Sequence, residues 1–283
     1  MTRCARPPAK PPDRIYDDVR GHQQIKAEAV NTAPPRLLGV RLAVHGLRKS
    51  YGGHEVLKGV DFEVNPGEIF VIMGPSGGGK SVLLKQLIGL EEPDQGEILI
   101  DGEPIQSPEL TTRYRVAMVF QSCALLANMT VGENIGIYLA EHHLKTPAEI
   151  AAIVSQKLGL IGLKDAGGKM PDELSGGMRK RVAIARAVIV EPQLILYDKP
   201  TSELDPISSV NIANDIVTLN ERIHATSLVV SNDRGLAFGI AKRIAMLDKG
   251  RIVAIGTPDE IKRDPNPRVR QFLNASITLS LNA

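Results

Sequence analysis

The sequence predicts an α/β fold built on a parallel sheet, with a helical segment inserted into it. From Val40 onward, short apolar runs bounded by Gly, Pro and Asp alternate with longer helical stretches. Some runs are continuous, as in Leu194, Ile195 and Leu196, which is typical of strands buried on both faces of a parallel sheet. Between about 122 and 190 the chain is mostly helical, which indicates a helical subdomain within the strand–helix order.

In the first half of the chain, each predicted strand is an apolar run bounded by turn residues, and the predicted helix follows a run of glycines. No internal repeat is apparent. The strands are expected at 60–64, 68–73, 97–101 and 116–120, and the helix at 79–90.

In the second half, three helices come first and the apolar strand runs then return. The helices are expected at 131–140, Pro147–Leu160 and 176–190, followed by a fourth at 208–223. The strands are expected at 193–197, 227–230, 243–247 and 251–255.

The two ends of the chain differ from the middle. Residues 1–38 contain three pairs of adjacent prolines and little hydrophobic periodicity, so we expect a disordered, proline-rich tail, with a docking segment as the alternative. Residues 39–257 are expected to form the folded domain, and 258–283 a short C-terminal tail.

Composition and charge give no indication of a nucleic-acid-binding protein, a membrane-spanning helix or a secretory signal. The formal net charge is +2, with 34 basic and 32 acidic residues, so the sequence gives no electrostatic reason to expect nucleic acid as a partner. No apolar stretch approaches the length of about 18 residues that a membrane-spanning helix needs. The first residues lack the apolar core of a secretory signal.

A phosphate-binding loop is predicted at 74–81, where the sequence matches G-x-x-x-x-G-K-[ST] between an expected strand and an expected helix. Glycines let the backbone wrap closely and point its amides at phosphate oxygens, and the helix N-terminus adds partial positive charge. Lys80 is expected to reach the β- and γ-phosphates of ATP, and the Ser81 hydroxyl to ligate Mg²⁺. The residues expected to hold the nucleotide are Gly74, Pro75, Ser76, Gly77, Gly78, Gly79, Lys80 and Ser81.

Asp198 is a second candidate for the metal site. It ends the strand expected at 193–197, where a carboxylate can hold the water shell of magnesium. A single Asp after a strand is more often a turn residue. Its occurrence downstream of a phosphate-binding loop favours the metal role.

A second motif stands at 174–178, Leu-Ser-Gly-Gly-Met. Ser175, Gly176 and Gly177 open the helix expected at 176–190, so they present a hydroxyl, unhindered amides and a positive helix end to an anion. The motif resembles the signature sequence of ABC-type ATPases. Tyr51, the phosphate-binding loop, Gln121, the signature, Asp198 and the segment 202–205 follow that family's order, and the resemblance covers about residues 41–257.

The resemblance implies the rest of the architecture and the partners. It implies a P-loop NTPase core with a parallel sheet, an antiparallel β subdomain and an inserted α-helical subdomain. A second ATPase subunit, expected to be a second copy of this chain, would pack head to tail, with 202–205 crossing the interface. Integral membrane permease subunits would hold the pair at the cytoplasmic face of the inner membrane.

The resemblance also implies roles for single residues. Tyr51 would stack on adenine, and Gln121 would ligate and sense magnesium. Ser175, Gly176 and Gly177 would contact the γ-phosphate that the other subunit holds.

One branch of the family is especially similar. Met178, the stretch 120–126 and the stretch 266–273 look like those of the ATPases of MCE-type lipid transporters, such as the Mla phospholipid system. This likeness implies transport of phospholipid or another hydrophobic compound.

Two positions depart from the family's pattern. Lys199 stands where the family places a glutamate that polarises the attacking water, and a charged ammonium cannot accept a proton. Asn232 stands where the family places a histidine that contacts the γ-phosphate, and His224 lies too early in the chain to replace it. Glu203 also replaces a small residue. Each change alone could be tolerated variation, but Lys199 and Asn232 together predict normal ATP affinity and slow hydrolysis.

Three functions remain open at this point. The first is the energy-coupling ATPase subunit of a transporter. The second is a degenerate module that binds ATP and dimerises but hydrolyses little, and thereby regulates its partner. The third, a soluble ABC protein of translation or DNA repair, is disfavoured because the chain has neither two cassettes nor a long coiled-coil insertion.

Overall fold

The computed structural model describes residues 39–108 and 110–275. The tail expected at 1–38 therefore lies outside the described residues. No helix in the described ranges is long and apolar enough to cross a membrane.

The core is a six-stranded sheet in which five neighbouring strands run parallel and the edge strand β10 runs antiparallel to β9. In spatial order the strands are β10 (Arg251–Gly256), β9 (Arg243–Asp248), β3 (Ile69–Met73), β8 (Thr226–Ser231), β7 (Leu194–Asp198) and β6 (Val116–Val119). The predicted parallel sheet is confirmed.

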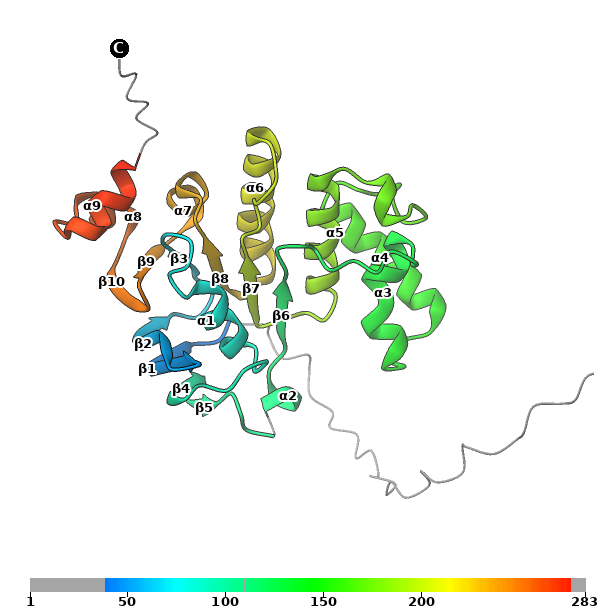
Figure 1. Cartoon of the computed structure of the whole chain (residues 1–283). Coiled ribbons are helices and arrows are strands. Elements are labelled where there is room, and N and C mark those ends of the chain that lie inside the picture. The colour runs from blue at the N-terminus through cyan, green and yellow to red at the C-terminus, as the bar shows by residue number, and fades with distance from the viewer. Residues whose placement is uncertain (1–38, 109, 276–283) are drawn as a thin grey trace, which may run out of the picture. The chain divides into compact units, whose positions relative to one another are not determined.

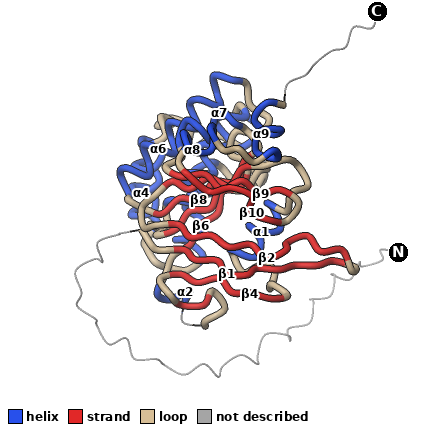
Figure 2. The backbone as a smooth tube through the Cα atoms, turned by 90° about the vertical axis from the view of Figure 1, so that its left-hand side faces the viewer, coloured by secondary structure: helices blue, strands red, loops and turns tan. Residues whose placement is uncertain are grey.

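A second, antiparallel sheet of four strands lies beside the first (Figure 2). Its order is β2 (His54–Val64), β1 (Leu42–Tyr51), β4 (Gln95–Ile100) and β5 (Glu103–Pro104). This is the antiparallel subdomain that the family resemblance implied. Strand β1 was not predicted from the sequence, because its register against β2 and β4 is shifted near Gly46 and its apolar alternation is broken there.

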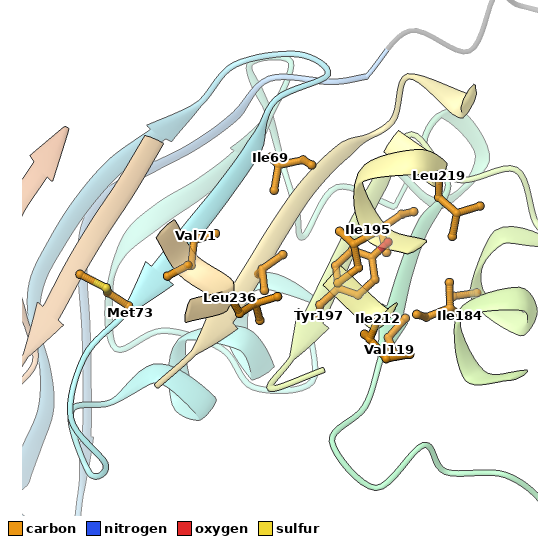
Figure 3. Packing of buried hydrophobic residues seen from close by; sticks show 14 of the residues in the cluster. Ile69, Val71, Met73, Val119, Ile184, Ile195, Tyr197, Ile212, Leu219 and Leu236 are labelled. Carbon is orange, nitrogen blue, oxygen red and sulfur yellow. The ribbon is translucent and has the colours of Figure 1, made fainter. Parts of the chain in front are cut away.

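Both faces of the parallel sheet are buried, as the continuous apolar runs predicted. Strand β3 shows the division: Ile69, Val71 and Met73 belong to one hydrophobic cluster, and Phe70 and Ile72 to another. Figure 3 shows the first cluster, where Ile184 and Ile212 of two covering helices lie near Ile195 and Tyr197 of β7. The helices that contribute to this cluster are α5 (Gly176–Val188), α6 (Pro206–Ile223) and α7 (Arg234–Ile240).

The other face is covered by α1 (Lys80–Leu87) and by the antiparallel sheet. Leu83, Leu84 and Leu87 of α1 are each at most 1% exposed. The helix that follows the phosphate-binding loop is therefore anchored in the core along one side, which fixes its N-terminus.

The inserted helices form their own cluster at the end of the sheet where β6 lies (Figure 1). It consists of α3 (Val131–Glu141), α4 (Pro147–Leu160) and the outer part of α5, and a short α2 (Leu110–Arg113) precedes β6. Helices α3 and α4 each begin with a capping box, at Thr130 and Thr146. The predicted insertion of a helical subdomain is confirmed.

The C-terminal segment differs from the tail expected at 258–283. It contains α8 (Pro258–Arg263) and α9 (Pro267–Asn274), and Ile261 and Val269 are at most 1% exposed in the main core. The folded chain therefore extends beyond the expected boundary. The sequence did not predict this, because each helix is too short to show a clear apolar period.

Candidate nucleotide-binding site

The functional residues gather at the carboxyl edge of the parallel sheet. The register pairs Met73 at the end of β3 with Ser231 at the end of β8, and Asp198 at the end of β7 with Val230. Parallel strands end at a common edge, so the phosphate-binding loop and the loops after β6, β7 and β8 meet there. In open α/β sheets this edge is where ligands bind.

The phosphate-binding loop needs glycine at both of its ends. Gly74 has φ 152°, and a Cβ atom there would lie 2.1 Å from the carbonyl oxygen of Leu247 on the neighbouring strand. Gly79 has φ 100°, and a Cβ atom there would lie 2.8 Å from a methyl group of Leu57. The loop is therefore pressed against β9 on one side and β2 on the other, and within it the amide of Gly78 donates a hydrogen bond to the carbonyl of Pro75 at 3.3 Å.

We expect Gly74→Ala to lower the free energy of unfolding by at least about 2 kcal/mol, because the new methyl group meets backbone and the residue must keep a left-handed φ. Thermal or urea unfolding measures the loss. Gly239→Ala in α7 is the matched control, since a Cβ atom there meets nothing within 4 Å. Equal stability of the two variants would contradict the packing described for Gly74.

Lys80 is the first residue of α1 and is only 4% exposed. Its ammonium donates hydrogen bonds to the carbonyl oxygens of Gly74 at 2.8 Å and Pro75 at 2.7 Å. Burial, together with the nearby Lys199, lowers the pKa of Lys80 to about 8, and Asp198 opposes the shift. An ammonium has three donors, and two of those of Lys80 are used within the described residues, so the third suits a phosphate oxygen.

A cavity of about 250 Å³ lies at the loop. Lys199, from the turn after β7, reaches the same cavity as Lys80 and Ser81. The complete lining is Val56, Ser76, Gly77, Gly79, Lys80, Ser81, Val82 and Lys199. Val56 and Val82 were not predicted; no motif marks Val56, which only the pairing of β2 against the loop brings to the site.

Of the three residues expected to hold magnesium, Ser81 and Asp198 lie where they could bind the metal. Ser81 lines the cavity, and Oδ1 of Asp198 is buried with no hydrogen-bond partner among the described residues, so it is an acceptor that a water or a cation could satisfy. Burial raises the pKa of Asp198, and Lys199, Lys180 and Lys80 oppose that shift. These two residues fit Mg²⁺.

Gln121 does not fit the metal in the conformation seen. Its side-chain oxygen, the atom expected to ligate magnesium, accepts a hydrogen bond from Nζ of Lys199 at 3.2 Å. Its backbone carbonyl accepts a short hydrogen bond from Lys180, which is 5% exposed and also donates to Ser202 at 3.3 Å. Lys180 was not predicted as a site residue, because a lysine in a predicted helix is normally expected on the surface.

Asn232 and Tyr51 lie outside the cavity lining. Asn232 is exposed directly after β8, and the next residue, Asp233, caps α7 and accepts a hydrogen bond from Thr201 at 3.0 Å. Tyr51 lies at the β1–β2 turn with 43% of its surface exposed. Its hydroxyl donates a short hydrogen bond to Glu91, which raises the pKa of Tyr51 to about 12 and leaves the ring on the surface.

The signature residues are separate from the cavity within one chain. Ser175 caps α5 by accepting a hydrogen bond from the amide of Met178 at 3.3 Å, and it is exposed. A Cβ atom at Gly176 would lie 3.3 Å from Leu204, and one at Gly177 3.5 Å from Ser208. The start of α5 therefore packs closely on the segment after β7, with Gly176 and Gly177 half-buried and Ser175 exposed at the cap. The structure does not bring Ser175, Gly176 and Gly177 to this chain's own phosphate-binding loop.

The sequence profile of the ABC transporter family matches residues 57–202, which is more than half of the chain. The chain belongs to this family. As an ABC-type ATPase and ATP-binding subunit it has many relatives, and the probable ribonucleotide transport ATP-binding protein mkl of Mycobacterium leprae is 40% identical over 241 residues, which cover 84% of this chain and 70% of the relative.

Two further comparisons show how broad the likeness to other ABC proteins is. Protein TRIGALACTOSYLDIACYLGLYCEROL 3, chloroplastic, of Arabidopsis thaliana is 37% identical over 252 residues, covering 81% of this chain and 72% of the relative. A dimeric structure of the ATP-binding cassette MJ0796 bound to ADP and Pi matches with a TM-score of 0.69 and 31% identity, covering 77% of this chain and 98% of that cassette. The predicted fold class is confirmed by this structural likeness.

Proposed function

We propose that this ATP-binding subunit holds MgATP at the carboxyl edge of its parallel sheet. The cavity that the phosphate-binding loop shares with Lys199 is the observation that carries this proposal. Glycine amides and the N-terminus of α1 face the triphosphate, and Lys80 binds its outer oxygens. Ser81 and Asp198 hold the metal, which, when bound, neutralises phosphate charge. Tyr51 stacks on adenine after its ring turns away from the Glu91 contact.

The ATP-bound state is a head-to-tail pair of subunits. Within one chain, Ser175, Gly176 and Gly177 lie outside the cavity, so an anion at the N-terminus of α5 would have to be held by another subunit. A second copy of this chain supplies the anion as the γ-phosphate of its own ATP. The cassette MJ0796, described as dimeric with ADP and Pi bound, gives a precedent among similar proteins.

Hydrolysis in this pair is slow. Lys199 presents donors and no acceptor to the phosphate cavity, so it cannot take a proton from an attacking water while it is charged. Asn232 after β8 can donate a hydrogen bond to phosphate but carries no positive charge. If a different ATPase subunit is the partner, that subunit's own site keeps its own residues, and this chain contributes the signature helix to it.

Coupling of ATP to transport requires integral membrane permease subunits, and the chain would act with them at the cytoplasmic face of the inner membrane. The proposed cargo is phospholipid or another hydrophobic compound. It rests on the likeness of Met178 and of the stretches 120–126 and 266–273 to MCE-type lipid transporters, and one relative carries the name of a galactolipid. Another relative is named for ribonucleotide transport, so the permease must decide the substrate.

A second candidate function is favoured by the contact between Lys199 and Gln121. In it, the chain binds ATP and dimerises but releases almost no phosphate, so that the ATP-bound pair regulates its permease partner. Phosphate release measured on the complete transporter, with and without its cargo, separates the two functions. Release that rises with transport supports energy coupling, and transport or gating without release supports the regulatory module.

Ser175→Asp is expected to abolish the ATP-dependent dimer. Aspartate caps a helix as well as serine does, so α5 should stay intact, but its carboxylate repels the γ-phosphate of the partner. Light scattering with and without ATP measures the dimer. Ser175→Asn is the matched control, because asparagine also caps helices and has the shape of aspartate but carries no charge. A normal ATP-dependent dimer in Ser175→Asp would contradict the head-to-tail arrangement.

A further inference from the structure

We propose that Lys199 acts as a built-in cation for the bound triphosphate, so that this chain binds ATP without requiring Mg²⁺. The inference rests on the proposed function, because it concerns the same phosphate cavity. Slow hydrolysis follows from the absence of a catalytic base at position 199. The inference goes further, because it assigns Lys199 itself a role in binding the triphosphate.

The position of Lys199 is fixed by its turn. Its amide donates a hydrogen bond to the carbonyl of Val230 at 2.8 Å, and its carbonyl accepts one from Ser202 at 3.1 Å. Its φ of 43° is left-handed, which is uncommon for a lysine and persists only where the surroundings impose it. The side chain then reaches the cavity that Lys80 and Ser81 also line.

The ammonium of Lys199 has donors to spare. It carries three N–H groups, and within the described part of the chain its hydrogen-bond partner is the side-chain oxygen of Gln121. Two donors therefore remain for phosphate oxygens. The same contact occupies the oxygen of Gln121 that was expected to ligate magnesium, so Lys199 both adds positive charge and removes one potential metal ligand.

The positive charges around the cavity also favour binding of ATP without Mg²⁺. Burial raises the pKa of the Asp198 carboxyl group, and the ammonium groups of Lys80, Lys180 and Lys199 act in the opposite direction. Lys180 is engaged with Gln121 and Ser202, which leaves Lys80 and Lys199 for the nucleotide. Among the described residues neither Lys80 nor Lys199 forms a salt bridge, since their hydrogen bonds go to neutral carbonyl and amide oxygens. Magnesium would therefore enter a region that already holds two uncompensated positive charges, so it gains less there than beside the glutamate that the family places at this position.

The test is the affinity for a non-hydrolysable ATP analogue, measured by calorimetry with excess Mg²⁺ and with EDTA. For the unaltered protein we expect EDTA to weaken binding by less than about tenfold. For Lys199→Met, which keeps the length of the stem but not the charge, we expect a loss of more than about a hundredfold in EDTA. Lys199→Arg should behave as the unaltered protein, because it keeps the charge.

The outcomes are distinct. Binding of the analogue in Mg²⁺ but not in EDTA by the unaltered protein would overturn the inference and leave the proposed function standing. Absence of binding in both conditions would overturn both. Binding in EDTA that is equally strong in Lys199→Met would overturn the role of Lys199. Lys85→Met, an exposed lysine of α1 paired with Glu91, controls for a general loss of positive charge, and the unaltered protein alone decides the matter if a variant fails to fold.

Discussion

Replacing Lys199 by glutamate and Asn232 by histidine in one protein is expected to raise the rate of ATP hydrolysis about 10²–10⁴-fold, the range in which a positioned acid–base group contributes. The glutamate places an acceptor at the cavity where Lys199 now presents donors. The histidine after β8 adds a group that can carry positive charge toward the γ-phosphate. Release of inorganic phosphate from saturating ATP measures the gain.

Each substitution alone is expected to give less than the pair, because an activated water and a stabilised γ-phosphate act on the same step. Lys242→Glu is the charge-matched control, since Lys242 is exposed and its amide bonds the carbonyl of Ile69 at the opposite end of β3. If the double variant released phosphate no faster than the unaltered protein, the explanation of slow turnover by these two residues would be wrong.

Lys80→Ala is expected to weaken ATP binding by at least about thirtyfold, because truncating one partner of a buried, hydrogen-bonded charge pair costs about 2–5 kcal/mol. The nucleotide-dependent rise in melting temperature should vanish at concentrations that saturate the unaltered protein. Without nucleotide the variant should fold, since the lost contacts are two carbonyl oxygens of its own loop.

Lys85→Ala provides the control for Lys80→Ala. Lys85 lies on the same helix, but it is half exposed and paired with Glu91 on the surface. Surface ion pairs contribute little to stability, so this variant should bind ATP normally. A full nucleotide-dependent shift in Lys80→Ala would place the triphosphate somewhere other than the loop at 74–81.

The parts of the site that are contiguous in sequence could be predicted from it. The loop at 74–81 carries its own geometry, because its glycines and the strand and helix beside it are neighbours in the chain. Ser175 could be recognised as a helix cap for the same reason, and the order of strands and helices was enough to predict a parallel sheet with a helical insertion.

Contacts between distant segments could not be predicted. The hydrogen bond between Lys199 and Gln121 depends on the pairing of β6 with β7, and no local pattern encodes it. Burial of Lys180 depends on how α5 packs against the loop after β6. The short helices α8 and α9 lack a clear apolar period, and their single buried residues Ile261 and Val269 are recognisable only in the folded core.

We infer that this ABC ATPase binds ATP at its phosphate-binding loop and hydrolyses it slowly because of the residues that line that loop. The decisive experiment is a single turnover, with protein in excess over ATP and with bound nucleotide and released phosphate followed together. We expect ATP to bind fully and most of it to be still intact after ordinary family members have converted theirs. Prompt conversion of the bound ATP, or failure of the protein to retain any, would contradict it.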